Sequence, residues 1–313
     1  NEWIPDGYLK FSRNDNYFDE IALEKKLKIR ILPEALPRSA EFITEYLDIM
    51  EIPDSEFMLW NNDEEWVSQI QYQNDLNVFY IGLNCSRPPF DNVLVRQAVN
   101  YAIDKDLIIK QIKNQNAGYT YGPIPNQLVN KKNYKYKYDL KKAIQLMEQA
   151  GYADGFSVEL WQSQSTEILN ITQAIQFQLR KIGVNVNIVR NDWNMYSQAV
   201  NEGKPDMYYR SWYADYPHAE NFLAPLFESE ISRKRWTRYE NKRLDSLIFR
   251  LQKTLDLNIQ REIILNSAEI LINDAPWIYL WNTRTAYISH KYIKNWQPSV
   301  MFNAEKYTKV YKN

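Results

Sequence analysis

Three side chains that could act together in catalysis lie within one short segment, RSWYADYPHAENFL (210–223). Ser211 could serve as a nucleophile, His218 as its base, and Asp215 as the acid that orients the histidine. The segment has no GxSxG nucleophile elbow, and Pro217 lies between the acid and the histidine, which disfavours the geometry of a triad. The sequence therefore predicts no catalytic residue. The carboxylate of Asp215 is left as a group that could pair with a cation.

The composition excludes several classes of function. Lys and Arg number 38 and Asp and Glu number 39, so the net charge of −1 gives no electrostatic reason to expect a nucleic acid or an anionic membrane. The single cysteine, Cys85, excludes an internal disulfide, and only 2 histidines leave little room for a metal site. The motifs GxGxxG, GxxxxGK[ST] and HExxH are absent. We therefore expect no cofactor, no metal and no nucleic-acid partner.

Strands and helices are expected to alternate directly before the Asp215 segment. The predicted elements are FSVELW (156–161) as a strand, a helix over 166–182, VNVNIV (184–189) as a strand, a helix from Asp192 to about Gly203, and DMYYR (206–210) as a strand. This β-α-β-α-β order predicts an open, largely parallel sheet covered by helices. Ligands bind beyond the carboxyl ends of the strands in such sheets. Asp215 follows the third strand, so it lies where binding is expected.

Two further strands are expected to connect two halves of the chain. NVFYIGLN (77–84) has the composition of a strand, and the segment near 278–288 does too. Both border the alternating region and neither resembles a flexible linker, so we predict that they run side by side. Asp91 and Asp104 are the expected N-caps of two helices that follow the first of these strands.

Three segments resemble the family 5 solute-binding proteins, the peptide and nickel receptors of ABC transporters. LNCSRPPFDNVLVRQAVNYAIDKDLI (83–108) is similar to the signature of the family, in which a strand ends in Asn, a PPF turn follows, and a VRQA helix leads to an AID step. TEYLDIMEIP (44–53) resembles the GEVDI strand of the family, although Glu45 and Tyr46 replace its Gly-Glu pair. RSWYADYPHAENFL resembles the motif of the peptide-binding branch.

The resemblance implies an α/β fold with two lobes, of the type II periplasmic-binding kind, with its amino-terminal part missing. Residues 1–76 would form part of the first lobe, 77–280 the second lobe with the peptide-binding loop, and 281–313 the return to the first lobe. The implied function is non-catalytic binding of short peptides and their delivery to the membrane permease of an ABC transporter. The implied location is outside the bacterial cytoplasm, in the periplasm or as a cell-surface lipoprotein, and we expect a monomer.

Other functions on the same fold stay open. One is a receptor for a nickel chelate or a sugar, and the scarcity of histidine weighs against nickel. The other is a surface adhesin or a signalling receptor that has kept the fold.

The same resemblance assigns ligand contacts to a small set of residues: Asp215, Trp212, Tyr213, Ala214 and Trp193. Asp215 would pair with the α-ammonium of a peptide, which carries a charge at neutral pH; alternatively it caps the turn before Pro217. Trp212 and Tyr213 would pair their backbone groups with the peptide main chain, or they pack as a buried aromatic pair. Trp193 would line the ligand cavity, or it lies on the inner face of a helix.

Two arginines near strand ends, Arg190 and Arg210, could meet a peptide carboxylate through bidentate pairing. Isolated arginines at such positions are more often solvated, so the sequence favours that interpretation for both.

Overall fold

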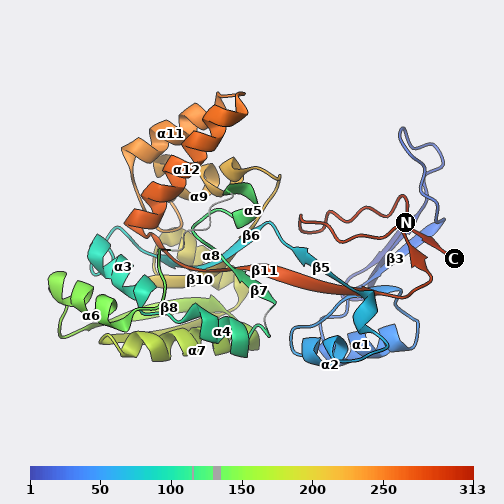
Figure 1. Ribbon diagram of the computed structural model, residues 1–313, viewed down its shortest axis with the longest axis horizontal. Helices are drawn as coiled ribbons and strands as arrows, with labels where there is room; N and C mark the ends of the chain where they lie inside the picture. Colours follow the sequence, from blue (N-terminus) through green and yellow to red (C-terminus); the bar gives the residue numbers. More distant parts are fainter. Residues whose placement is uncertain (115, 130–134) are drawn as a thin grey trace. The chain divides into compact units, whose positions relative to one another are not determined.

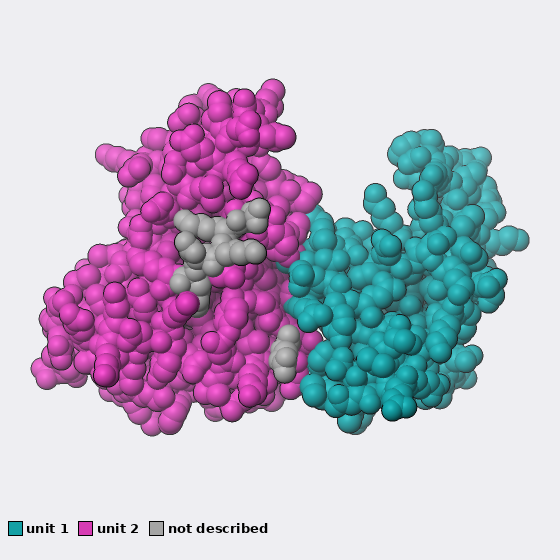
Figure 2. Space-filling view, viewed as in Figure 1, with its two compact units in different colours: residues 1–75, 284–313 teal, residues 76–283 magenta. Residues whose placement is uncertain are grey.

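Residues 1–114, 116–129 and 135–313 are described by the computed structural model. The chain forms two units, which Figure 2 colours separately: unit 1 comprises Asn1–Asp75 and Arg284–Asn313, and unit 2 comprises Leu76–Thr283. The chain therefore passes from one unit to the other twice, once before β6 (Asn77–Leu83) and once within the long strand β11 (Trp277–Ser289).

Unit 1 is built from short strands and helices (Figure 1). Its elements are β1 (Glu2–Ile4), β2 (Tyr8–Ser12), β3 (Lys26–Arg30), α1 (Ala35–Ile43), β4 (Ile49–Glu51), α2 (Phe57–Asn61), η1 (Val67–Gln69), β5 (Ile70–Asn74), β12 (Ile293–Lys294) and β13 (Tyr311–Lys312). Its core gathers around Phe42, whose ring stacks on His290 at 4.2 Å and meets Trp60 edge-on at 5.6 Å. His290 also contacts the carbonyl oxygen of Phe42 through Nε2 at 2.9 Å, so this histidine is a packing residue.

Unit 2 contains the alternating region. Its elements besides β6 and most of β11 are α3 (Val93–Tyr101), α4 (Lys105–Gln111), β7 (Ala117–Tyr119), α5 (Asn126–Val129), α6 (Leu140–Gln149), β8 (Phe156–Ser163), α7 (Thr166–Arg180), β9 (Val184–Asn191), α8 (Trp193–Glu202), β10 (Met207–Tyr213), η2 (Ala219–Phe222), α9 (Ala224–Phe227), α10 (Ser229–Ser232), α11 (Lys242–Gln252) and α12 (Leu257–Asp274). Figure 1 shows α6 and α7 on one side of the strands and the α11–α12 pair on the other. Among the described residues, no helix is long and apolar enough to cross a bilayer.

The three strands of the β-α-β-α-β region are parallel as expected, but the sheet of unit 2 as a whole is mixed rather than largely parallel. Its strands follow the order β11-β6-β10-β8-β9, and only the pairs β10–β8 and β8–β9 are parallel. β6 and β11 come from outside the β-α-β-α-β region and insert antiparallel beside β10. The predicted neighbours 77–84 and 278–288 run side by side over part of their length, with Ile81 opposite Ile278, so that prediction is confirmed for residues 79–82 and 277–281. Residues 284–288 pair with β5 instead.

The caps show how local chemistry sets the helices. Asp104 accepts a hydrogen bond from the backbone N–H of Leu107, as expected for an N-cap. The cap of α3 is Asn92 rather than Asp91, because the side chain of Asn92 accepts from the N–H of Leu94. Asn and Asp cap helices about equally well, so the sequence did not distinguish these adjacent residues.

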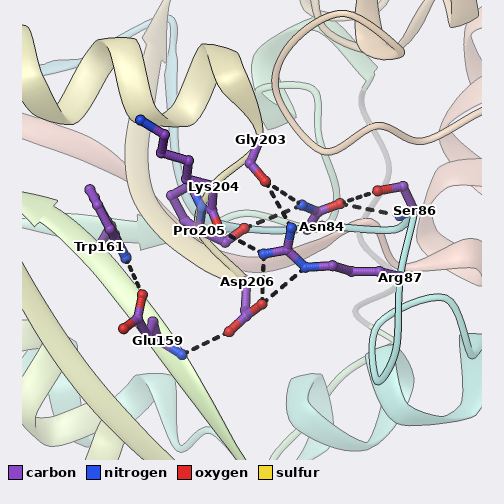
Figure 3. Close-up of polar contacts among 9 residues, drawn as sticks. All are labelled: Asn84, Ser86, Arg87, Glu159, Trp161, Gly203, Lys204, Pro205 and Asp206. Atoms are coloured by element: carbon purple, nitrogen blue, oxygen red, sulfur yellow. Dashed lines mark hydrogen bonds and ion pairs between the residues drawn. The ribbon is translucent and has the colours of Figure 1, made fainter.

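The turn after β6 fastens the connection between α8 and β10 (Figure 3). Arg87 donates to the Asp206 carboxylate from Nε at 3.2 Å and from Nη2 at 2.8 Å, and it also reaches the carbonyl oxygen of Gly203 at 3.0 Å. Asn84 donates to that same carbonyl at 3.0 Å. Asp206 in turn accepts from the N–H of Glu159 on β8 at 3.0 Å. These bonds fix the start of β10 and therefore the direction in which its far end points.

Candidate ligand-binding site

β10 has one paired edge and one edge that is paired only in part. On the β6 side every residue from Met207 to Tyr213 has a partner, whereas on the β8 side pairing covers only Met207 and Tyr208. From Tyr209 to Tyr213, no strand of the described chain pairs with that second edge. The carbonyl of Tyr209 accepts there from the hydroxyl of Tyr196 on α8. Backbone groups in an antiparallel strand alternate in direction, so those of Ser211 point the same way as those of Tyr209.

Trp212 and Tyr213 belong to this strand, although the sequence placed the end of the strand at Arg210. The strand is longer because β6 continues to pair with it, Val78 lying opposite Trp212. The two side chains point to opposite faces. Trp212 meets Trp236 edge-on at 6.2 Å, and Tyr213 meets Phe79 at 6.1 Å. Both are partly exposed, so they do not form one buried aromatic pair.

Ala214 ends the strand. It is 6% exposed, and its backbone N–H donates to the carbonyl oxygen of Leu76 at 2.9 Å. Its contact with the start of β6 anchors the strand end directly before Asp215.

Asp215 is exposed and lies directly beyond the end of β10. Its backbone N–H donates to Oδ1 of Asn221 at 3.0 Å, and its carboxylate accepts from Nδ2 of Asn221 at 3.2 Å. The adjacent 3-10 helix η2 is capped by His218. The carboxylate of this exposed residue thus accepts a hydrogen bond from one neutral amide.

Asn221 is a site residue that the sequence did not identify. It is 3% exposed, and its Oδ1 also accepts from Nε1 of Trp212 at 3.2 Å. One amide therefore positions both Trp212 and Asp215. The available signal was the spacing ADYPHAEN, in which the amide follows the carboxylate across a turn, but nothing in the sequence showed that it turns back onto the strand.

Trp193 is 56% exposed at the first position of α8. The inner face of that helix is occupied instead by Tyr196, Ala199 and Val200. The Trp193 ring centroid lies 5.3 Å from the guanidinium carbon of Arg210, which itself lies 4.4 Å from the ring centroid of Trp236. Arg210 is therefore partly enclosed between two indoles, whereas Arg190 is exposed as expected.

The residues Trp193, Trp212 and Asp215 are joined by a continuous series of contacts within unit 2. The contacts run from Asp215 through Asn221 to Trp212, then through Trp236 to Arg210 and Trp193. Neither nitrogen of the His218 ring takes part in this series. Nδ1 accepts from the N–H of Glu220 at 3.1 Å, and Nε2 lies 3.4 Å from Oε1 of Gln260.

A separate cavity of 1090 Å³ lies within unit 1. It is lined by β2, β3, β4 and the carboxy-terminal segment, including Arg30, Trp296 and Tyr307. None of the residues predicted to contact a ligand lines it.

Comparison with known proteins places the chain among binding proteins. Residues 1–233 match the family described as bacterial extracellular solute-binding proteins, family 5 Middle. Heme-binding protein A of Haemophilus influenzae is 30% identical over 288 residues, which cover 88% of this chain and 52% of that protein. The dipeptide-binding protein of Escherichia coli is 27% identical over 285 residues, covering 88% and 53%. The chain thus spans about half the length of these curated relatives.

A solved structure shows the same fold with a bound peptide. The periplasmic binding protein DppA of Helicobacter pylori, in complex with the peptide STSA, is 26% identical with a TM-score of 0.85, and the match covers all of this chain and 62% of that one. The two-lobed α/β fold expected from the sequence is the fold of this neighbour. The chain belongs to family 5 of the bacterial extracellular solute-binding proteins, which are the extracytoplasmic binding components of ABC transporters.

Proposed function

We propose that this chain binds short peptides along the open edge of β10 and presents them, without chemical change, to the permease of an ABC transporter. The observation that carries the proposal is the combination of that edge with the Asp215 carboxylate at its end. The edge offers main-chain hydrogen bonds, and the carboxylate offers a charge for the amino terminus.

An extended peptide would add to the sheet as a further strand. β6 pairs with β10 as far as Tyr213 on one side, whereas β8 pairs with it only as far as Tyr208 on the other. The rest of that second edge of β10 is unpaired and could accept one further strand. Strand addition uses main-chain hydrogen bonds and so accepts many side chains. The surrounding aromatic side chains, Trp193 and Trp212, offer apolar contact area at a low cost in conformational entropy.

Asp215 would bind the α-ammonium of the peptide. That group has a pKa near ~8 when free, so it is charged at neutral pH and needs an anionic partner once it is taken from water. Asn221 holds the carboxylate through a neutral amide and leaves its negative charge uncompensated. Among the ion pairs of the described residues, none includes Asp215.

A second ligand class is favoured by the relatives rather than by the site. Proteins named glutathione-binding protein GsiB, from several enterobacteria, are 31–33% identical over parts of the chain, and one relative is named for heme. Glutathione and hemin therefore belong in any ligand panel beside simple peptides. A nickel chelate, a sugar, or a role as adhesin or signalling receptor has no specific contact in this site to support it. The proposal includes two alternative locations outside the cytoplasm. The protein is either free in the periplasm or attached to the membrane through a lipid.

The test is a comparison of trialanine, N-acetyl-trialanine, glutathione and hemin as ligands. Binding to the 313-residue chain is followed by NMR shifts of backbone amides in β10, which report weak as well as tight binding. The proposal expects free trialanine to shift Ser211 and Trp212, and the acetylated peptide to bind much more weakly. Equal binding of both peptides, or binding of hemin alone, would contradict it.

A further inference from the structure

The guanidinium of Arg210 contacts two indole rings and the hydroxyl of Tyr196 rather than a carboxylate. Its carbon lies 4.4 Å from the Trp236 ring centroid and 5.3 Å from that of Trp193. Within the part of the chain that the structure describes, Arg210 forms no ion pair. Indole faces attract a cation, but they accept no hydrogen bond as a carboxylate does. A partly buried positive charge without an anion is costly unless something else compensates for it.

Several buried donors beside this guanidinium also have no partner. Nη1 of Arg210 is buried and unpaired, and so are the hydroxyls of Tyr80 and Tyr208. Tyr80 lies directly opposite Arg210 in the β6–β10 register, and Tyr208 precedes Arg210 by one strand repeat, so all three side chains share one face of the sheet. The two tyrosines are 0% and 1% exposed. Burial raises the pKa of Tyr80, and the positive charge of Arg210 opposes that rise.

The position of this group in the sheet is the one where ligands bind in α/β folds. The last pair between β10 and β8 joins Tyr208 to Trp161, two residues before Ser163, which pairs with Asn191. Nδ2 of Asn191 is another buried donor without a partner. Ser163 and Asn191 are the last residues of β8 and β9. The unpaired amide of Asn191 thus lies at the carboxyl end of its strand, and Arg210 lies two residues beyond the last residue of β10 that pairs with β8.

We propose that Arg210, between Trp193 and Trp236, forms a subsite for a carboxylate group of the bound ligand. The planar guanidinium would donate two parallel hydrogen bonds to the two carboxylate oxygens. This inference rests on the proposed function, and it deepens it by adding a second charged anchor on the same strand as Asp215. Ligands with an ammonium at one end and a carboxylate at the other would then be selected and oriented.

The two indoles differ in how firmly they are held. Trp236 is 7% exposed, and its Nε1–H donates to the carbonyl oxygen of Pro225 at 3.1 Å, so it forms a fixed wall. Trp193 is 56% exposed at the start of α8, and its ring centroid lies 5.3 Å from the guanidinium carbon of Arg210. Trp193 is the side chain that moves when a carboxylate reaches Arg210. The indole signals of Trp193 and Trp236 are therefore direct reporters of occupancy.

The experiment compares trialanine with its carboxyl-terminal amide on the 313-residue chain and on Arg210→Met, which keeps an apolar stem between the indoles. The wild type is expected to bind the free acid about tenfold more tightly than the amide, and Arg210→Met to bind both alike. A second comparison measures the binding of Asp-Ala-Ala amide and of Asn-Ala-Ala amide. Tighter binding of the Asp peptide would show that Arg210 takes a side-chain carboxylate as well as the carboxylate at the chain terminus. Arg190→Met, at an exposed arginine of β9, is the matched control and should keep the wild-type preference.

The inference is overturned if the wild type shows no preference for the acid, or if Arg210→Met keeps it. If Arg210→Met fails to fold, Arg210→Lys replaces it, because lysine keeps the charge but cannot donate in a bidentate way; an unchanged preference then overturns the inference. If no peptide binds at all, the proposed function fails. The carboxylate subsite is then tested separately with succinate, a ligand that carries carboxylates but no peptide. Shifts of the Trp193 and Trp236 indole signals by succinate, and not by chloride at equal ionic strength, would support the subsite, and their absence would overturn it.

Discussion

Asn221 holds Asp215 from two directions, accepting from its backbone N–H at 3.0 Å and donating to its carboxylate at 3.2 Å. The acceptor oxygen of the same amide also takes the Nε1–H of Trp212 at 3.2 Å. A nearly buried neutral side chain thereby fixes an exposed charge at the end of β10. The arrangement restricts where the carboxylate points and leaves its charge available.

Asp215→Asn should leave the fold intact and weaken peptide binding by at least ~2 kcal/mol, the scale for removing one partner of an enclosed charge pair. The loss should be much smaller for an N-acetylated peptide, because that ligand brings no ammonium. Calorimetry with both ligands on both proteins gives the comparison. A turn-capping Asp would behave differently, since its loss would lower stability and affect both ligands alike. Identical ranking of the two ligands by wild type and variant would remove Asp215 as the amino-terminal anchor.

Asn221→Ala should lower the free energy of unfolding by about 1–3 kcal/mol, because the N–H groups of Trp212 and Asp215 lose their acceptor in a largely buried place. Peptide binding should weaken as well, since the carboxylate is no longer oriented. Asn187→Ala, at an exposed position of β9, is the matched control and should change neither quantity appreciably. Chemical denaturation measures the first effect and calorimetry the second. Full stability with unchanged affinity in Asn221→Ala would show that the amide positions nothing.

Local chemistry predicted much of unit 2. The helix that ends at Gly203 begins at the N-cap Asp192, whose side chain accepts from Asn194 and Met195, and Gly203 adopts the left-handed conformation that a helix end requires. Asp139 caps α6 in the same way. These features depend on a few neighbouring residues, so a single sequence contains them. The family resemblance supplied the two-lobed fold, which no local pattern could give.

What the sequence missed depends on residues far apart in the chain. The segment Ser211–Tyr213 looks like a loop by itself and becomes strand because β6 lies beside it. Arg210 looked like a solvated arginine because Trp236, which covers one of its faces, is brought there by a later loop. The sheet is mixed for the same reason, since β6 and β11 insert beside β10 from outside the alternating region.

Lys105 should make the stability of the protein depend on pH. Burial lowers its pKa to about 7, and the neighbouring Asp106 opposes that shift. Between pH 7 and the usual lysine pKa near ~10.4, the unfolded chain binds a proton at this position that the folded chain does not, so stability rises with pH. Lys105→Met removes this dependence, and its stability relative to wild type should therefore fall as the pH rises from about 7 to about 9.5, a range that lies inside this window.

The exposed Lys110 of the same helix provides the control, because Lys110→Met should differ from wild type by a constant amount across that range. Urea denaturation at each pH gives the free energies. A flat difference between Lys105→Met and wild type would show that Lys105 keeps its proton in the folded state.

Gly82→Ala should destabilise unit 2 although the change adds a single methyl group. A Cβ at Gly82 would lie 2.1 Å from Cζ of Tyr208 and 2.5 Å from its Cε1, so the buried tyrosine ring must move. Tyr208 is 1% exposed, which leaves it little room, and overpacking of this kind costs about 1–3 kcal/mol. Gly118→Ala is the matched control, because a Cβ there meets nothing within 4 Å. Since Tyr208 shares a sheet face with Arg210, the displaced ring should also shift the indole signals of Trp193 and Trp236 in NMR spectra. A Gly82→Ala protein as stable as Gly118→Ala, with unshifted indole signals, would show that the tyrosine ring is not packed against the backbone of β6.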